Sequence, residues 1–166
     1  MKPNKVRNYN AHETERMLQV HGMALASFQS RAAAFVVDFL LAFALFMGLA
    51  FGVAWLATLL KVDIGDHMLK FDFQHWYSLI FLVLYFSLAT YWGKGMTPGK
   101  RLLKIRIVSL THEQLGFWQS IERALGYGAS FLEFGFGFMQ FFINTNRRTV
   151  HDRIAETIVV RVVKGA

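Results

Sequence analysis

The stretch RAAAFVVDFLLAFALFMGLAFGVAWLATLL, from Arg31 to Leu60, decides the fold class of this chain. After Arg31 it contains a single charged residue, Asp38. About 20 apolar residues suffice to cross the hydrocarbon core of a bilayer as a helix, and this run is longer. It also exceeds the roughly 7–15 residues of a signal-peptide core and follows a polar N-terminal segment. We therefore predict a transmembrane helix over residues 32–60 that the mature protein retains.

The composition favours a membrane protein over other classes. Of the 166 residues, 54% are hydrophobic and 17% are charged, whereas soluble domains average about 25% charged residues. The net charge is +7, but Lys and Arg gather beside the apolar runs. Positive-inside topology explains this distribution better than nucleic-acid binding does. The absence of cysteine excludes disulfides and thiolate metal sites.

A second uncharged run, from Trp76 to Trp92, predicts a second transmembrane helix over residues 75–92. Aromatic residues at both of its ends are typical of an interfacial belt. The segment that follows, residues 93–110, holds several Lys and Arg and no acidic residue. This charge bias predicts that the segment is cytoplasmic, and with it an N-terminal arm over residues 1–30. One membrane domain would then occupy residues 31–166.

The basic segment contains Thr97, Pro98 and Gly99, followed by Lys100. Pro followed by Gly predicts a type II turn, and the neighbouring cations would lie near acidic lipid head groups. Alternating apolar and basic residues then predict a strand before residue 110, and the C-terminus predicts another over residues 157–163. We expect the two strands to pair as a cytoplasmic ribbon, since each alone would have unpaired edges.

A third apolar stretch, residues 115–143, is long enough to cross the membrane but contains charged residues and several glycines. A single crossing would place the basic C-terminus outside, against the positive-inside rule and the ribbon. A Gly-broken re-entrant hairpin would return the chain to the cytoplasmic side, and we favour it. A plain third crossing stays open as the alternative.

Several motifs have an ordinary explanation. The sequence GKGMTPGK, residues 93–100, lacks the spacing of a phosphate-binding loop. The histidines are dispersed, so the sequence predicts no metal site and no cofactor. Gly48 and Gly52 form a GxxxG pattern, which favours close helix packing within the chain or between copies.

Arg31 and Asp38 share one helix face, but they lie two turns or about 10.5 Å apart along the axis. Arg31 can extend toward the interface. Asp38 then needs another cation, because a charge within the membrane usually has a partner. Arg123, in the third apolar stretch, is the candidate. Asp38 would either hold helices together or change protonation during transport; burial raises a carboxyl pKa and a cation lowers it, so both readings stay open.

Three stretches of the chain resemble the RDD family of bacterial membrane proteins, named for one arginine and two aspartates. They are RAAAFVVD at residues 31–38, GKGMTPGKRLLKIRIV at residues 93–108 and VHDRIAETIVV at residues 150–160. The match at His151 and Asp152 implies that Asp152 is the second aspartate. Glu156 departs from the small residue expected at its position. The resemblance covers most of the chain from Arg31 to Val163.

The resemblance implies an integral protein of the bacterial inner membrane, with transport of an unidentified ligand, and ion or proton exchange as a candidate. We expect Asp38 to titrate, and Arg31, Arg123, His151 and Asp152 to complete the polar set. Too few helices are present to enclose a pathway, so we expect a homo-oligomer or a subunit of a membrane complex. The alternative is a non-transporting anchor or scaffold that recruits partners or anionic lipid. We expect no enzymatic activity, since no nucleophile or metal constellation accompanies His151.

Overall fold

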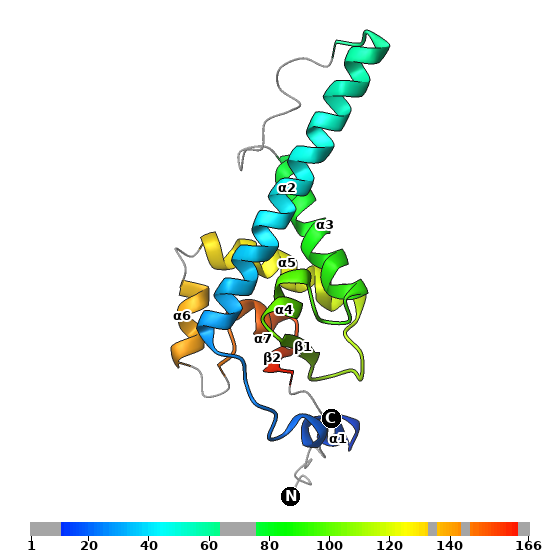
Figure 1. Ribbon diagram of the computed structural model, residues 1–166. Coiled ribbons are helices and arrows are strands. Elements are labelled where there is room, and N and C mark those ends of the chain that lie inside the picture. The colour runs from blue at the N-terminus through cyan, green and yellow to red at the C-terminus, as the bar shows by residue number, and fades with distance from the viewer. Residues whose placement is uncertain (1–10, 64–75, 133–135, 144–146, 163–166) are drawn as a thin grey trace, which may run out of the picture.

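The computed structural model describes residues 11–63, 76–132, 136–143 and 147–162 (Figure 1). Residues 1–10 of the predicted arm, residues 64–75 of the loop between the apolar runs, and Val163 lie outside the described residues. The elements are, in order, α1 (Ala11–Val20), α2 (Phe28–Leu60), α3 (Trp76–Trp92), α4 (Pro98–Leu102), β1 (Ile105–Ser109), α5 (Phe117–Leu132), α6 (Phe136–Ile143), α7 (Val150–Ile154) and β2 (Thr157–Arg161).

The first apolar run forms α2, a helix of 33 residues. Ser27 caps its start, since the Ser27 hydroxyl accepts a hydrogen bond from the Ser30 N–H. Lys61, in the left-handed conformation, ends it by donating its N–H to the carbonyls of Ala57 and Thr58. The helix therefore begins a few residues before the predicted position 32 and ends at the predicted Leu60.

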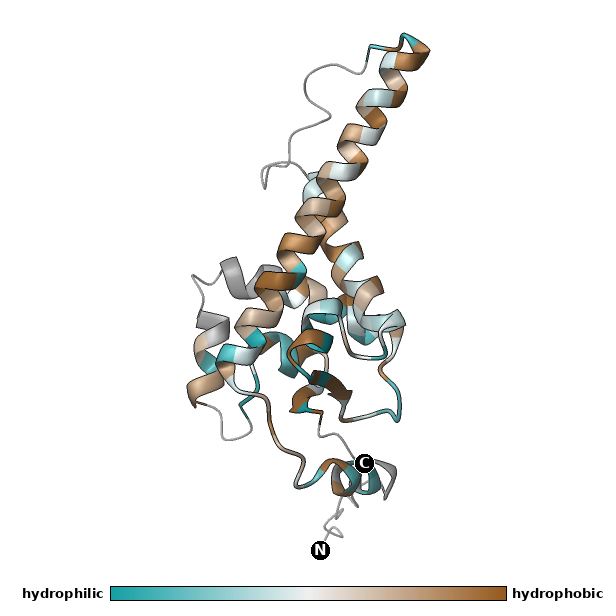
Figure 2. Cartoon of the chain, viewed as in Figure 1, coloured by the Kyte–Doolittle hydropathy of each residue, from teal (hydrophilic) through white to brown (hydrophobic). Residues whose placement is uncertain are grey.

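The C-terminal part of α2 projects away from the other described elements (Figure 1), beyond the contact of Phe46 with Phe81 on α3. Only 17% of its most apolar stretch is buried, whereas a core helix of a soluble protein would be mostly buried. Figure 2 shows apolar residues over much of its projecting part. Among the described residues it is the one helix both long and apolar enough to cross a membrane. The second apolar run forms α3, which has 17 residues and exposed Trp76 and Trp92 at its ends.

The predicted type II turn at Thr97, Pro98 and Gly99 is wrong, because these residues begin the short helix α4. Thr97 is the N-cap residue and Pro98 occupies the first turn, where its missing N–H costs no hydrogen bond. Gly99 is not among the described residues with positive φ. Its lack of a side chain serves a different purpose: a Cβ there would lie 2.3 Å from the backbone oxygen of Ala34 on α2.

The predicted ribbon is confirmed, with β1 and β2 antiparallel and Ile107 opposite Val159. Ile105 and Ile107 are buried while Arg106 is exposed, as the alternation predicts. β2 ends at Arg161, earlier than the predicted residue 163, and both of its faces are covered. Residues 24–26 supply a further partner, since the Ala26 N–H donates to the Val159 carbonyl at 2.9 Å. One edge of the ribbon is thereby paired.

The third apolar stretch contains two helices, α5 and α6, rather than one continuous crossing helix. Figure 1 shows α5 running across the direction of α2 and α3, with α6 beside the start of α2. Gly126 does not break α5. Instead it permits α7 to approach, because a Cβ at Gly126 would lie 2.7 Å from the Cβ of His151. Residues 133–135 and the side chains of residues 128–138 lie outside the described part.

Candidate functional site

Asp38 is completely buried on α2, and its carboxylate is held by the start of α4. The Gly99 N–H donates to Oδ1 at 2.7 Å, and the Thr97 hydroxyl donates to Oδ2. The Lys100 ammonium lies 3.8 Å from Oδ2 and donates to the Thr97 hydroxyl oxygen at 3.3 Å. Both carboxylate oxygens therefore accept hydrogen bonds, and Lys100 supplies the compensating charge.

Asp152, also completely buried, lies on α7 between two arginines from other helices. Nη1 of Arg31, on α2, lies 2.7 Å from Oδ2, and Nη1 of Arg123, on α5, lies 2.5 Å from Oδ1. The Thr149 N–H donates to Oδ2 at 3.3 Å, and Arg123 donates also to the Thr157 hydroxyl. One carboxylate thus ties α2, α5 and α7 together with the first residue of β2.

The structure corrects the predicted partner of Asp38, because Arg123 binds Asp152 and Lys100 takes its place. It also corrects two predicted surface positions. Arg31 does not extend to the interface but binds Asp152, with a second hydrogen bond to the Val159 carbonyl at 3.2 Å. Lys100 does not lie on an exposed turn, since it is 5% exposed. Each of these cations is paired with a buried carboxylate, because a charge that is buried without a partner is strongly destabilising.

His151 is buried beside Asp152, with Nε2 3.8 Å from Oδ1 of Asp152 and 2.9 Å from the Thr149 hydroxyl oxygen. Burial is the largest effect on the His151 imidazole and lowers its pKa to about 3. Asp152 acts in the opposite direction, and the nearby Arg123, Lys100 and Arg31 lower this pKa. Burial alone would raise the pKa of Asp152, but the Arg123 and Arg31 guanidiniums hold that pKa well below its usual range. At neutral pH the carboxyl is charged and the imidazole is neutral.

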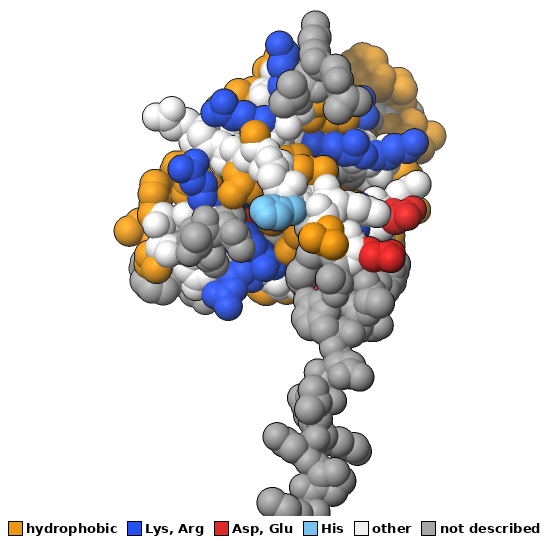
Figure 3. Space-filling view, turned by 90° about the horizontal axis from the view of Figure 1, so that it is seen from below, with side chains coloured by type: hydrophobic (Ala, Val, Ile, Leu, Met, Phe, Trp, Pro, Cys, Tyr) orange, Lys and Arg blue, Asp and Glu red, His pale blue; other side chains and the backbone are white. Residues whose placement is uncertain are grey.

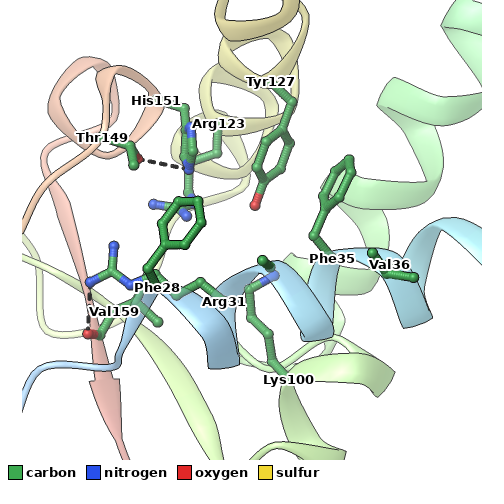
Figure 4. A pocket seen from close by; sticks show the side chains of 11 residues that line it. Phe28, Arg31, Phe35, Val36, Lys100, Arg123, Tyr127, Thr149, His151 and Val159 are labelled. Atoms are coloured by element: carbon green, nitrogen blue, oxygen red, sulfur yellow. Dashed lines mark hydrogen bonds between the residues drawn. The ribbon is translucent and has the colours of Figure 1, made fainter. Parts of the chain in front are cut away.

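A cavity of about 230 Å³ is lined by the cations of both clusters, Lys100, Arg31 and Arg123 (Figure 4). Figure 4 shows the Lys100 ammonium and the Tyr127 hydroxyl pointing toward the same space. Its lining combines apolar residues, chiefly from the first turns of α2, with the three buried cations. The lining residues are Phe28, Arg31, Ala32, Phe35, Val36, Lys100, Arg123, Tyr127, Thr149, His151 and Val159.

The charges around this cavity do not balance. Arg31, Lys100 and Arg123 contribute three positive charges, and Asp38 and Asp152 contribute two negative charges. The sum, 3 − 2, is +1 with His151 neutral. In addition, Nε of Arg31 and Nε of Arg123 are buried and donate no hydrogen bond in the structure. The groups around the cavity therefore include unpaired buried donors and carry one excess positive charge.

Of the predicted polar set, the structure brings Arg31, Arg123, His151 and Asp152 together, and places Asp38 with Lys100 at the same cavity. Sequence reasoning named Thr97 only as part of the basic turn, without its bond to Asp38, and did not name Thr149. Both had a local signal. Thr before Pro is typical of a helix N-cap, and Thr149 with Asp152 has the spacing of a capping box. Tyr127 gave no comparable signal.

Gly48 and Gly52 lie apart from this site, on the projecting part of α2. A Cβ at either position would meet nothing within 4 Å among the described residues. They therefore do not mediate packing within the described chain, and packing between copies stays a prediction. The described residues contain no group of three or more His, Cys, Asp or Glu that could hold a metal ion.

The fold and site define a class of protein: a mainly helical, membrane-associated protein with one long apolar helix and buried ion pairs at one end of it. The sequence matches the RDD family over residues 25–156, so the chain belongs to this family, as the three motifs indicated. Arg31, Asp38 and Asp152 all lie inside that range. No curated protein matches the chain, and no solved structure does.

Proposed function

We propose that the protein is an integral membrane protein whose helices α2 and α3 cross the bilayer, with its ribbon on the cytoplasmic side and its ion pairs at the cytoplasmic end of the membrane helices. The 33 residues of α2 extend about 50 Å, more than the roughly 30 Å of a hydrocarbon core. Its first turns can therefore lie at the interface while the rest crosses. Figure 3, seen from the end opposite the projecting part of α2, shows many Lys and Arg and few acidic side chains. The positive-inside rule supports a cytoplasmic location for such a surface.

Within this membrane role, the function best supported is proton exchange at Asp38, and we regard the protein as non-enzymatic. The observation that carries the proposal is a completely buried carboxylate on the apolar helix, whose ion partner, Lys100, lines a cavity. Intramembrane carboxylates commonly mark proton and ion pathways. Protonation of Asp38 would remove its charge attraction to Lys100 and loosen α4 from α2.

Exchange of a metal cation is less well supported than exchange of a proton. Both oxygens of Asp38 already accept hydrogen bonds, from Gly99 and Thr97, so a metal ion would have to displace them. The excess positive charge around the cavity would also repel a divalent metal ion more strongly than a proton. A proton can bind the carboxylate without a coordination shell and without new space.

Purified protein in liposomes that contain a pH-sensitive dye tests this proposal. We expect an imposed proton or salt gradient to drive a dye response with the wild type, and Asp38→Asn to abolish it, because the amide cannot carry the proton. Glu156→Gln removes an exposed carboxylate and serves as the matched control. Equal responses from empty liposomes and wild-type liposomes would refute proton exchange.

A second candidate function is that of a membrane anchor or scaffold. It is favoured because both carboxylate oxygens of Asp38 already accept hydrogen bonds, from Gly99 and Thr97. In this case the aspartate serves only to fix α4 against α2. The wild type would then give no proton flux, and Asp38→Asn would lower thermal stability without any other loss. The flux measurement and the thermal melt of the same preparations distinguish the two functions.

A further inference from the structure

The cavity has an apolar wall on one side and a cationic wall on the other. Phe28, Ala32, Phe35 and Val36 form the apolar wall from the first turns of α2. Ala32 is exposed and Val36 is 55% exposed. The apolar wall therefore continues onto the outer face of α2, and an apolar chain could leave the cavity along it.

On the cationic wall, Lys100 has hydrogen-bond donors that the structure does not use. Lys100 is 5% exposed and has three N–H donors, of which the structure uses one, to the Thr97 hydroxyl oxygen at 3.3 Å. With one net positive charge, this wall has the chemistry that binds a phosphate or another singly charged oxyanion.

The volume restricts what can be enclosed. A cavity of about 230 Å³ is below the roughly 300–1,000 Å³ of pockets that enclose drug-sized ligands. It can hold a polar head but not a complete lipid. The cavity also lies beside the first turns of α2. In the proposed topology this end of α2 lies at the membrane interface, which is the level of the lipid head groups.

We propose that this cavity binds the phosphodiester head group of an anionic phospholipid, with the acyl chains lying against Ala32 and Val36 on the outer face of α2. The bound phosphate neutralises the excess charge and accepts hydrogen bonds from the Lys100 ammonium, which points into the cavity (Figure 4). This binding goes beyond the proposed proton exchange and does not require it. It gives the three buried cations an additional ligand besides the two aspartates.

Binding by the full chain in a neutral detergent, followed by native mass spectrometry, tests the proposal. The probes are short-chain phosphatidylglycerol, phosphatidylcholine with the same chains, and inorganic phosphate. We expect phosphatidylglycerol to bind at least about tenfold more tightly than phosphatidylcholine, because its head group has a net negative charge. Equal binding of both lipids would refute charge recognition. Inorganic phosphate that binds as tightly as phosphatidylglycerol would show a site for free anions and overturn the lipid assignment.

A pair of variants localises the site. Ala32→Trp fills the mouth of the cavity and leaves every charge in place, while Ala44→Trp adds the same side chain to an exposed position of α2 outside the cavity. We expect Ala32→Trp to weaken phosphatidylglycerol binding by about tenfold or more and Ala44→Trp to leave it unchanged. Wild-type affinity in folded Ala32→Trp would overturn the proposal. Lys100→Gln provides a second check, since it removes a charge from the opposite wall.

Discussion

The backbone N–H of Gly99 donates a 2.7 Å hydrogen bond to Oδ1 of Asp38, at a contact with no room for a side chain on residue 99. A Cβ at that position would lie 2.3 Å from the Ala34 carbonyl oxygen and 3.0 Å from the Asp38 carboxyl carbon. Two of the three family motifs therefore meet at one point, the first in α2 and the second in α4. Residue 99 is a glycine because the backbones of α2 and α4 approach closely there. They approach closely because the Gly99 N–H binds the buried Asp38 carboxylate.

The first prediction concerns this contact. Gly99→Ala should destabilise the protein by about 1–3 kcal/mol, because the backbone oxygen of Ala34 cannot move aside without shifting α2. Gly48→Ala is the matched control, since a Cβ there meets nothing within 4 Å. Thermal unfolding in detergent measures both. If the two variants unfold at the same temperature, the contact between α4 and α2 is not as close as described.

The second prediction concerns the Asp152 cluster. Asp152→Asn leaves Arg31 and Arg123 buried without a counter-charge and should cost about 3–5 kcal/mol of stability. Glu156→Gln, an exposed carboxylate close by in sequence, should change stability by less than about 0.5 kcal/mol. Chemical denaturation of the two variants gives the comparison. A stable Asp152→Asn protein would mean that the arginines find other partners.

The third prediction is a dependence of stability on pH through His151. Its pKa is about 3 in the folded chain and 6.5 in the unfolded chain, so the unfolded state binds more protons between these values. Stability is therefore complete above about pH 6.5 and falls as the pH decreases toward 3, by up to about 1.4 kcal/mol per pH unit. The depressed pKa of Asp152 adds a loss in the same direction at lower pH, below its unfolded value of 3.8.

The comparison of His151→Gln with His21→Gln isolates this effect. His21 is exposed, and His21→Gln is the matched control for the replacement of a histidine. His151→Gln should flatten the slope between about pH 6.5 and 4, whatever its effect on stability at pH 7. Denaturation midpoints at several pH values supply the measurement. An unchanged slope in His151→Gln would show that this histidine is not the titrating group.

The fourth prediction concerns membrane topology. The chain has no native cysteine, so single cysteines can be labelled directly in cells. Val62→Cys, just past the end of α2, should react with an impermeant reagent from outside, because α2 crosses once. Lys94→Cys after α3 and Arg153→Cys on α7 are both exposed and should react only after permeabilisation. Lys94→Cys and Arg153→Cys reacting from opposite sides would contradict a cytoplasmic location for the whole polar part.

The fifth prediction tests association between copies through α2. Gly48→Leu combined with Gly52→Leu should reduce the oligomer fraction in crosslinking experiments, because both glycines leave open space for a second helix. Ala44→Leu, another exposed position of α2, controls for added bulk. Wild-type crosslinking in the double variant would place any association elsewhere.

The sequence by itself determined the local elements and the family. The apolar run gave α2, the aromatic-ended run gave α3, and two-residue alternation gave β1 and β2, because each pattern lies within one segment and follows from helix or strand geometry. The family motifs identified Arg31, Asp38 and Asp152 for the same reason. The error at Thr97 to Gly99 was also local, since a Pro-Gly pair fits both a type II turn and the first turn of a helix.

Only the tertiary structure decided which charges pair. Asp38 binds Gly99, 61 residues away, and Arg31 binds Asp152, 121 residues away, so no local pattern could distinguish Lys100 from Arg123 as the partner of Asp38. Burial removes water from every one of these groups, so each buried charge needs a partner of opposite charge. The packing of α2, α4, α5 and α7 determines which partner lies nearest. The cavity and its excess positive charge are products of that packing.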